Sequence, residues 1–143
     1  MEFVRAETPQ AESVTTFLLE QDVRPAPRLA DVAALLGRSD AALFCAAHEG
    51  RIKGLAAGVT EGPLCHLIHF LIAGDNVDEH AGRLIELVEQ SAREAGAAIL
   101  AAQAECGSDM DRLLRSFGFS VDWQENDAVR GRVVTVVHLL KVL

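Results

Sequence analysis

Apolar residues in the middle of the chain change from a continuous run to a helical period. Residues 64–73 form a mostly apolar run of strand length, and a Gly-Asp-Asn turn signal follows them. Such a run is typical of a central strand covered on both faces. From Ala81 onward, apolar residues recur at every third or fourth position, which predicts a helix with one apolar face that ends at Gly96. Asp78 and Glu79 suit the first turn of this helix, where carboxylates complement unpaired N–H groups.

The chain before this unit alternates between strand-like and helix-like patterns. Thr8 and Pro9 are typical of a helix cap and a first helical residue. Residues 21–28 contain two prolines and therefore predict a surface connection between two helices. The expected strands span residues 2–6, 42–47 and 52–59, and the expected helices span residues 9–20 and 29–36.

The last third of the chain predicts one more strand, a short helix and a closing hairpin. Residues 97–103 should form a fifth strand, parallel to the fourth because a helix connects the two. The remaining expected elements are a helix over residues 108–116 that Ser108 caps, and an antiparallel pair over residues 120–125 and 132–143 with Asn126, Asp127 and Gly131 in the connection.

Length and composition limit the number of domains. The 143 residues (15.4 kDa) can bury about two-thirds of the unfolded surface without disulfides, so we expect a single domain over residues 1–143. No apolar run approaches the roughly 20 residues that a membrane helix needs, and the N-terminus MEFVRAET lacks the apolar core of a signal peptide. These features predict a cytoplasmic protein that does not bind membranes.

The charge and the cysteine count argue against several classes of function. A net charge of −8 and an isoelectric point near 5.0 argue against nucleic acid and anionic membranes as partners, and are compatible with a cationic amine. The three cysteines, Cys45, Cys65 and Cys106, are odd in number and lack metal-type spacing. We therefore expect reduced thiols and no metal site.

Three segments resemble motifs of the GNAT superfamily of N-acetyltransferases. ALFCAAHEGRIKGLAAG, residues 42–58, is similar to the second and third strands of that family, and RLLRSFGF, residues 112–119, is similar to its x-L-Y-x-k-x-G-F motif. The family's Q/R-x-x-G-x-G/A loop falls on residues 76–81, and the apolar pair Leu84 and Ile85 follows it. The resemblance covers the whole chain and implies a mixed α/β fold. We expect a mostly antiparallel sheet of about six or seven strands, with helices on both faces and a splay between the fourth and fifth strands.

The resemblance also implies that acetyl-CoA is a co-substrate. In the family, the backbone of the fourth strand holds the pantetheine arm, and the loop and helix start hold the pyrophosphate. The residues at these positions are Leu71, Ile72, Ala73, Asn76, Val77, Asp78, Glu79, His80, Ala81, Gly82 and Arg83. Glu79 replaces the first glycine of the motif, and its charge opposes a phosphate. His80 or Arg83 could neutralise the phosphate, and Arg83 could equally pair with Glu79 or Glu86.

Acetyl transfer to an amine needs a group that takes the proton of the amine. His66 and His69 lie on the fourth strand, where family members often carry a base, and histidine has a suitable pKa. Three residues apart on a regular strand, they should face opposite sides of the sheet, so only one can line the cleft. We rank His69 first because it is nearer the cleft end of the strand. Each could instead be a buried histidine that its neighbours satisfy.

The resemblance places the family's usual acid, a tyrosine, at Leu114, and the chain contains no tyrosine. Ser108 is our first candidate for the group that protonates the departing thiolate, with Ser116, Cys106 or a water molecule as alternatives. Ser108 could also act only as a helix cap, and Cys106 only as a small apolar residue. A coenzyme thiolate is a stable leaving group near neutral pH, so loss of the acid slows catalysis without preventing it.

The leading hypothesis is an acetyl-CoA-dependent N-acetyltransferase that transfers the acetyl group directly to a small amine or a peptide amine. The alternative is a catalytically inactive, GNAT-like module with a binding or regulatory role, in which Asp78 and Glu79 replace the phosphate as counter-charge of the helix. The apolar run over residues 133–143 is too continuous for an exposed edge strand and predicts a homodimer through the C-terminal strand. Trp123 and His138 then serve either as packing residues or as part of that dimer seam.

Overall fold

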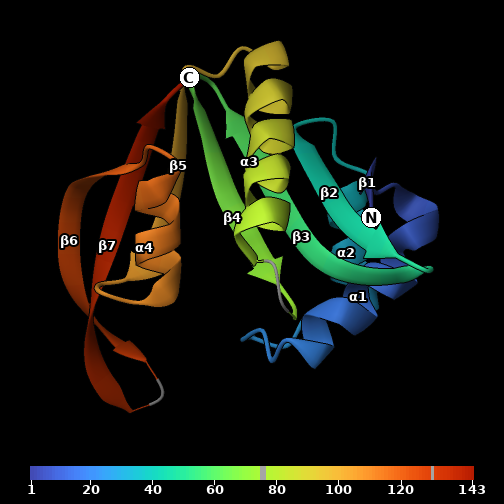
Figure 1. The fold of residues 1–143 in the computed structure, drawn as a ribbon, viewed down its shortest axis with the longest axis horizontal. Helices are drawn as coiled ribbons and strands as arrows, with labels where there is room; N and C mark the ends of the chain where they lie inside the picture. Colours follow the sequence, from blue (N-terminus) through green and yellow to red (C-terminus); the bar gives the residue numbers. More distant parts are fainter. Residues whose placement is uncertain (75–76, 130) are drawn as a thin grey trace.

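The computed structural model describes residues 1–74, 77–129 and 131–143. Within those residues, seven strands form one mixed sheet, and helices cover both of its faces (Figure 1). The strands are β1 (Glu2–Arg5), β2 (Ala41–His48), β3 (Arg51–Glu61), β4 (Leu64–Ile72), β5 (Ile99–Glu105), β6 (Ser120–Val129) and β7 (Arg132–Val142). The helices are α1 (Ala11–Glu20), α2 (Leu29–Leu36), α3 (Val77–Glu94) and α4 (Asp109–Ser116), with a 3₁₀ turn at Thr8–Gln10 before α1. The predicted α/β architecture is confirmed.

The sheet divides into two halves where β4 meets β5. Its order is β1-β2-β3-β4-β5-β7-β6, and the neighbouring strands are antiparallel except for β4 and β5. This parallel pair is in register only where residues 64–66 face residues 99–101, after which the two strands separate. Figure 1 shows them meeting near the C-terminus and diverging below it. The predicted splay between the fourth and fifth strands is therefore confirmed.

Two apolar cores lie on opposite faces of the sheet. The first lies under α3 and α4 and is centred on Leu84, Ile85, Val88, Leu100, Leu114, Val137 and Leu139. The second lies under α1 and α2 and is centred on Val14, Phe17, Leu18, Val32, Leu43 and Leu55. The second core draws only on β1–β4 and their helices, so within the described residues no helix covers the second face of β5, β7 and β6. None of the described helices is long and apolar enough to cross a membrane.

The helical segment that includes α1 begins with a 3₁₀ turn at Thr8, one residue earlier than the sequence predicted. Glu7, not Thr8, precedes the 3₁₀ turn, and its backbone N–H donates to Oε1 of Gln10 at 2.7 Å. Thr8 and Pro9 lie inside the turn. A capping residue followed three positions later by glutamine satisfies free N–H groups in both directions, which explains why Glu7 takes the cap position.

The β6–β7 hairpin is longer than predicted. Asn126 and Asp127 pair with Thr135 and Val134 of β7, so the expectation that they form the connection is wrong. The hydroxyl of Thr135 donates to Oδ1 of Asn126 at 3.1 Å, and this cross-strand bond holds Asn126 in the ladder.

β7 is an inner strand rather than an edge. It pairs with β5 on one side and with β6 on the other, which accounts for its continuous apolar run without a second subunit. The edge strand on this side of the sheet is β6, whose charged residues oppose pairing with another sheet. The reason for expecting a dimer through the C-terminal strand is therefore wrong, and the dimer itself stays a prediction.

Asp111 fixes α4 to the turn before it. Its buried carboxylate accepts the N–H of Gly107 at 2.8 Å and Nε of Arg115 at 2.7 Å. The hydrogen bond from Arg115, with help from Gly107, lowers the pKa of Asp111 in spite of its burial. Ser108 Oγ accepts the N–H of Asp111 at 3.1 Å, so Ser108 caps the helix as expected.

Replacing Asp111 with asparagine is expected to lower the free energy of unfolding by about 1–2 kcal/mol at neutral pH, because a charge-assisted pair is lost. The folded-state pKa of Asp111 is lowered, so its stabilising contribution is present above the unfolded-state pKa of about 3.9 and is lost as the pH falls through the folded-state value. Urea unfolding at neutral pH and at about pH 3 measures the effect. The difference between Asp111→Asn and the wild type should shrink at the lower pH, and a constant difference would contradict the assignment.

Candidate functional site

A bulge in β4 brings two histidines to one face of the sheet. His66 pairs with Val59 and His69 with Ala57, and the register shifts between the two pairs because Ile68 is an extra residue. Val59 and Ala57 point to the same side of β3, so His66 and His69 also share a side. The expectation that they face opposite sides is wrong, since it assumed a regular strand.

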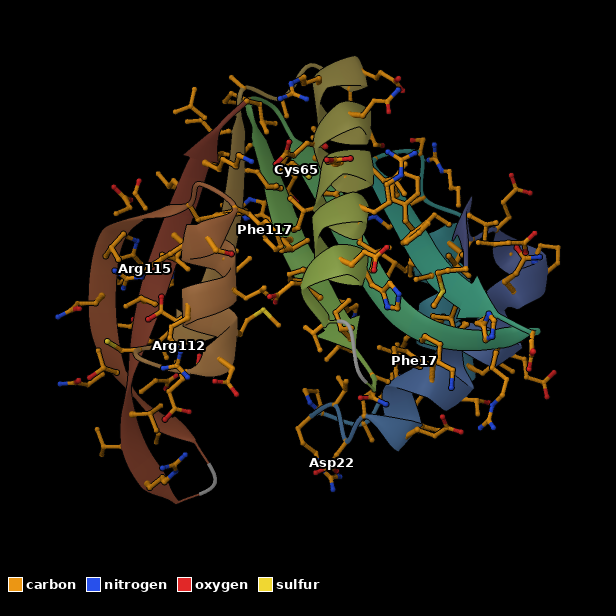
Figure 2. All side chains as sticks on the ribbon, in the orientation of Figure 1. Phe17, Asp22, Cys65, Arg112, Arg115 and Phe117 are labelled. Atoms are coloured by element: carbon orange, nitrogen blue, oxygen red, sulfur yellow. The ribbon has the colours of Figure 1, made fainter. Side chains whose placement is uncertain are left out.

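A groove of about 600 Å³ lies between the start of α3 and α4. Its lining residues are Ile72 of β4, Val77 and Asp78 of α3, and Asp109, Met110, Arg112, Leu113 and Ser116 of α4. Arg112, labelled on α4 in Figure 2, is the one cation among the described residues that line the groove. The groove thus combines apolar side chains with one guanidinium and the carboxylates of Asp78 and Asp109.

The segment predicted as a phosphate loop is helical from Val77 onward. Asn76 lies outside the described residues. Asp78 lines the groove, whereas Glu79 is exposed and does not line it, so Asp78 is the acid that a ligand there would meet. The first N–H groups of an α-helix lack partners within the helix, and together with the helix dipole they favour an anion at the start of α3.

Ala81 and Gly82 have packing roles. Ala81 is fully buried in the core under α3. A Cβ on Gly82 would lie 3.5 Å from the ring of Phe117, which Figure 2 shows between α3 and α4. The small side chains therefore let α3 approach the sheet and the end of α4.

His80 and Arg83 both turn away from the groove. The ring of His80 meets Phe3 of β1 edge-on, with 6.3 Å between ring centroids, and its Nδ1 is buried without a hydrogen-bond partner among the described residues. Arg83 pairs with Glu86 at 3.4 Å, one of the two pairings expected for it. The structure brings neither side chain to the groove.

The C-terminal half of β4 offers free backbone groups beside the groove. The N–H of Ala73 donates to the carbonyl of Lys53 at 2.7 Å. Because backbone groups alternate along a strand, those of Leu71 also point toward β3, and those of Ile72 point toward the gap. β5 pairs with β4 only as far as His66, so no strand in the described part of the chain pairs with Ile72 across the gap. Of the three predicted pantetheine contacts, Leu71, Ile72 and Ala73, only Ile72 points its backbone groups toward the gap.

A larger pocket of about 710 Å³ opens on the opposite face of the sheet, at the same splay. Its lining residues are Leu64, His66, Leu67 and Ile68 of β4, Ala101, Ala102 and Gln103 of β5, and Asp122, Trp123, His138, Leu139 and Leu140 of the β6–β7 hairpin. Both cavities include residues of β4. The two cavities lie at different positions along β4, since Ile72 lines the groove and residues 64 and 66–68 line the pocket.

Three imidazoles lie near the splay, and among the described residues only one of them has a carboxylate partner. Nε2 of His138 lies 2.8 Å from Oε1 of Glu125, and the imidazole stacks on Trp123 with 3.7 Å between ring centroids. His66 lines the pocket without a hydrogen-bond partner among the described residues. His69 lines neither cavity, and burial lowers its pKa. His69, the first candidate for the base, thus lines neither cavity, whereas His66 and His138 both line the pocket.

Ser108, the cap of α4, and Ser116, its last residue, differ in their access to the groove. Ser108 does not line it, and its Oγ is engaged by the N–H of Asp111. Ser116 lines the groove, and its hydroxyl donates to the carbonyl of Leu113 at 2.6 Å. Leu114, at the family's tyrosine position, is buried in the core. The structure therefore places Ser116 rather than Ser108 beside the ligand space.

Comparison by sequence gives no relative, whereas comparison by structure gives many. No known protein family matches the sequence. No curated protein matches it either. An acetyltransferase of the GNAT family from Streptococcus pneumoniae superimposes with a TM-score of 0.82 over 99% of this chain and 100% of that chain, at 16% identity. The chain has the GNAT fold.

Two further solved structures share the GNAT fold. The ribosomal-protein-alanine N-acetyltransferase of Brucella melitensis gives a TM-score of 0.83 at 18% identity, over 100% of both chains. The protein yncA of Salmonella typhimurium, solved with its cofactor acetyl-CoA, gives 0.84 at 16% identity, over 100% of this chain and 94% of that chain.

Sequence reasoning missed two parts of the site in this GNAT fold. Arg112 and Leu113 could have been found, because the short helix was predicted and residues 109, 112, 113 and 116 share one helical face. The contact between Glu125 and His138 follows a bulge at Asp122 of β6, and the sequence carries no signal for that bulge.

Proposed function

We propose that this chain is a cytoplasmic N-acetyltransferase that transfers the acetyl group of acetyl-CoA to a small amine or a peptide amine. The observation that carries the proposal is the splay between β4 and β5, with a groove on one face of the sheet and a pocket on the other. A thioester held at the gap would meet an amine that enters from the opposite face. Holding two reactants together in this way can supply several kcal/mol of the barrier.

The groove residues fit acetyl-CoA. Met110 and Leu113 suit the apolar parts of the pantetheine arm. The backbone groups of Ile72 that point to the gap can hydrogen-bond to the arm, as they would to a neighbouring strand. The start of α3 and the guanidinium of Arg112 suit the phosphates. Bound there, acetyl-CoA would supply the activated acetyl group, and the chain's own residues would position it and exclude water.

One observation favours the alternative of a non-catalytic binding or regulatory module. Asp78 and Asp109 place two carboxylates on the groove wall against the one guanidinium of Arg112. A carboxylate about 4 Å from a phosphate costs on the order of 1 kcal/mol when both are solvated. In this alternative, the two carboxylates keep acetyl-CoA out and the chain binds a partner without acetyl transfer.

A titration with acetyl-CoA and with CoA distinguishes the two functions. A ligand at about 100 times its dissociation constant adds roughly 2.7 kcal/mol, which should raise the thermal midpoint by several degrees. Calorimetry then gives the affinity. The absence of any shift at millimolar concentration would reject the transferase and leave the binding module.

Replacing Arg112 with alanine is expected to weaken the binding of CoA about tenfold, because charge-assisted bonds to phosphate are lost. Arg112 is held in place by the carbonyl of Gly107 and the carboxylate of Asp109. Pantetheine, which lacks the phosphates, should bind the variant and the wild type equally. Calorimetry with both ligands separates the loss of charge from a change in fold.

The matched control is Arg83→Ala, which removes the same charge from the exposed side of α3, outside the groove. It should leave the affinity for CoA unchanged within about twofold, as exposed charge pairs contribute little. Equal affinities for the two variants would contradict a phosphate contact by Arg112.

A further inference from the structure

The β6–β7 hairpin holds a histidine and a carboxylate in a fixed arrangement on the wall of the larger pocket. Trp123 pairs with His138 in register, and Glu125 is two residues farther along β6 on the same side of the hairpin. The imidazole is stacked on the indole at 3.7 Å and bonded to Glu125 at 2.8 Å. The side chain of His138 is only 16% exposed. Two contacts therefore fix the ring orientation, which a group that accepts a proton requires.

Glu125 determines which nitrogen of His138 can accept a proton. A carboxylate only accepts hydrogen bonds, so Nε2 of His138 carries the hydrogen and donates it to Glu125. Nδ1 is then the nitrogen of the neutral ring that can take a proton. His66 lines the same pocket but has no such partner among the described residues.

The pairing of the strands places His66 and His138 on opposite sides of β5. Gln103 of β5 pairs with His138, and Ala101, two residues earlier on the same face of β5, pairs with His66 of β4. β5 therefore forms the floor of the pocket, with His66 on one wall and His138 on the other. Asp122 also lines the pocket, and Glu125 bonds to its wall. A positively charged ligand is favoured there because both carboxylates are anionic.

The geometry points to His138 as the group that takes the proton of the acceptor, a primary aliphatic ammonium, with Glu125 as its positioning residue. This inference rests on the proposed function and names the base of that reaction. One N–H bond of the ammonium breaks, a bond from that proton to Nδ1 of His138 forms, and the imidazolium returns the proton to water. Glu125 stays ionised throughout. The neutral amine that remains is the nucleophile that acetyl transfer needs.

Labelling with bromoacetyl-CoA tests the inference without knowledge of the acceptor. The reagent carries an alkylating carbon at the position of the acetyl group, and a nearby imidazole nitrogen displaces bromide to form a nitrogen–carbon bond, with loss of one proton. The protein should carry Cys106→Ala, because Cys106 is the exposed thiol. We expect peptide mass spectrometry to locate the label on His138, and acetyl-CoA to protect it.

The role of Glu125 is tested in the same experiment. Glu125→Gln should slow the labelling of His138 about tenfold because the carboxylate that orients the ring is lost, with an unchanged affinity for acetyl-CoA and an unchanged thermal midpoint. Glu105→Gln is the matched control, since Glu105 pairs with Arg132 and does not line the pocket. It should leave the labelling rate unchanged.

Other outcomes would exclude the role of His138, the role of Glu125 or the proposed function itself. A label on His66 or His69, or no labelled histidine in a protein that binds acetyl-CoA by calorimetry, would exclude His138 as the base. Equal rates for Glu125→Gln and Glu105→Gln would exclude Glu125 as its positioning residue. If acetyl-CoA does not bind at all, the proposed function fails first, and this inference fails with it.

Discussion

Gly58→Ala is expected to lower the thermal midpoint by several degrees. A Cβ at this position of β3 would lie 2.8 Å from Sγ of Cys65 and 3.1 Å from Cγ1 of Val88, so something must move. Neither neighbour can retreat easily, because Cys65 is buried on β4 and Val88 is buried on α3. Overpacking of this kind costs about 1–3 kcal/mol, and for a chain of this length each kcal/mol corresponds to roughly 3–5 °C. Differential scanning calorimetry measures the change.

Two further variants show whether the close approach of α3 is the cause. Gly37→Ala is the control, since its Cβ would meet only ordinary contacts at 3.6 Å, and its midpoint should change little. Cys65→Ala removes the nearer obstacle and should restore part of the stability in the Gly58→Ala background, giving a non-additive double-mutant cycle. If Gly58→Ala is as stable as Gly37→Ala, the spacing between α3 and the sheet does not limit stability.

The helices and strands could be predicted because their signals are local. The period of three to four over α3 and the apolar run of β4 each require only neighbouring residues to be read. The position of β7 is a different matter, since an apolar run looks the same in an inner strand and in a buried dimer edge. Only its pairing with both β5 and β6 distinguishes them. The bulge at Ile68 is also invisible in the sequence, because the extra residue is defined by the register with β3.

The sequence predicted which segments form the candidate site, but not which of their side chains point into it. The resemblance located Ile72, Val77 and Asp78, which line the groove. It could not show that Glu79 points elsewhere, because adjacent helical residues differ by about 100° around the axis and the first helical residue was unknown. For the same reason it could not rank Ser116 above Ser108. Which side chains enter such a site depends on the residue at which the helix begins, and only the folded structure shows that residue.

Ile72→Pro is expected to weaken the binding of acetyl-CoA at least about tenfold while the protein stays folded, because one backbone hydrogen bond to the ligand is removed. The N–H of Ile72 points to the gap between β4 and β5, so proline there breaks no bond of the β3–β4 ladder. Proline also carries no charge that could repel the ligand. Calorimetric titration with acetyl-CoA gives the change in affinity, and circular dichroism monitors the fold.

Ile72→Ala separates the effect of the backbone from that of the side chain. Like Ile72→Pro it removes the isoleucine side chain, but it keeps the backbone N–H. The isoleucine side chain lines the groove, so alanine should lose some affinity and proline should lose clearly more. Leu71→Pro is the opposite case: the backbone of Leu71 points toward β3, so proline there should destabilise the sheet itself. Equal affinities for Ile72→Pro and Ile72→Ala would mean that acetyl-CoA does not use the free edge of β4, and the splay would then need another explanation.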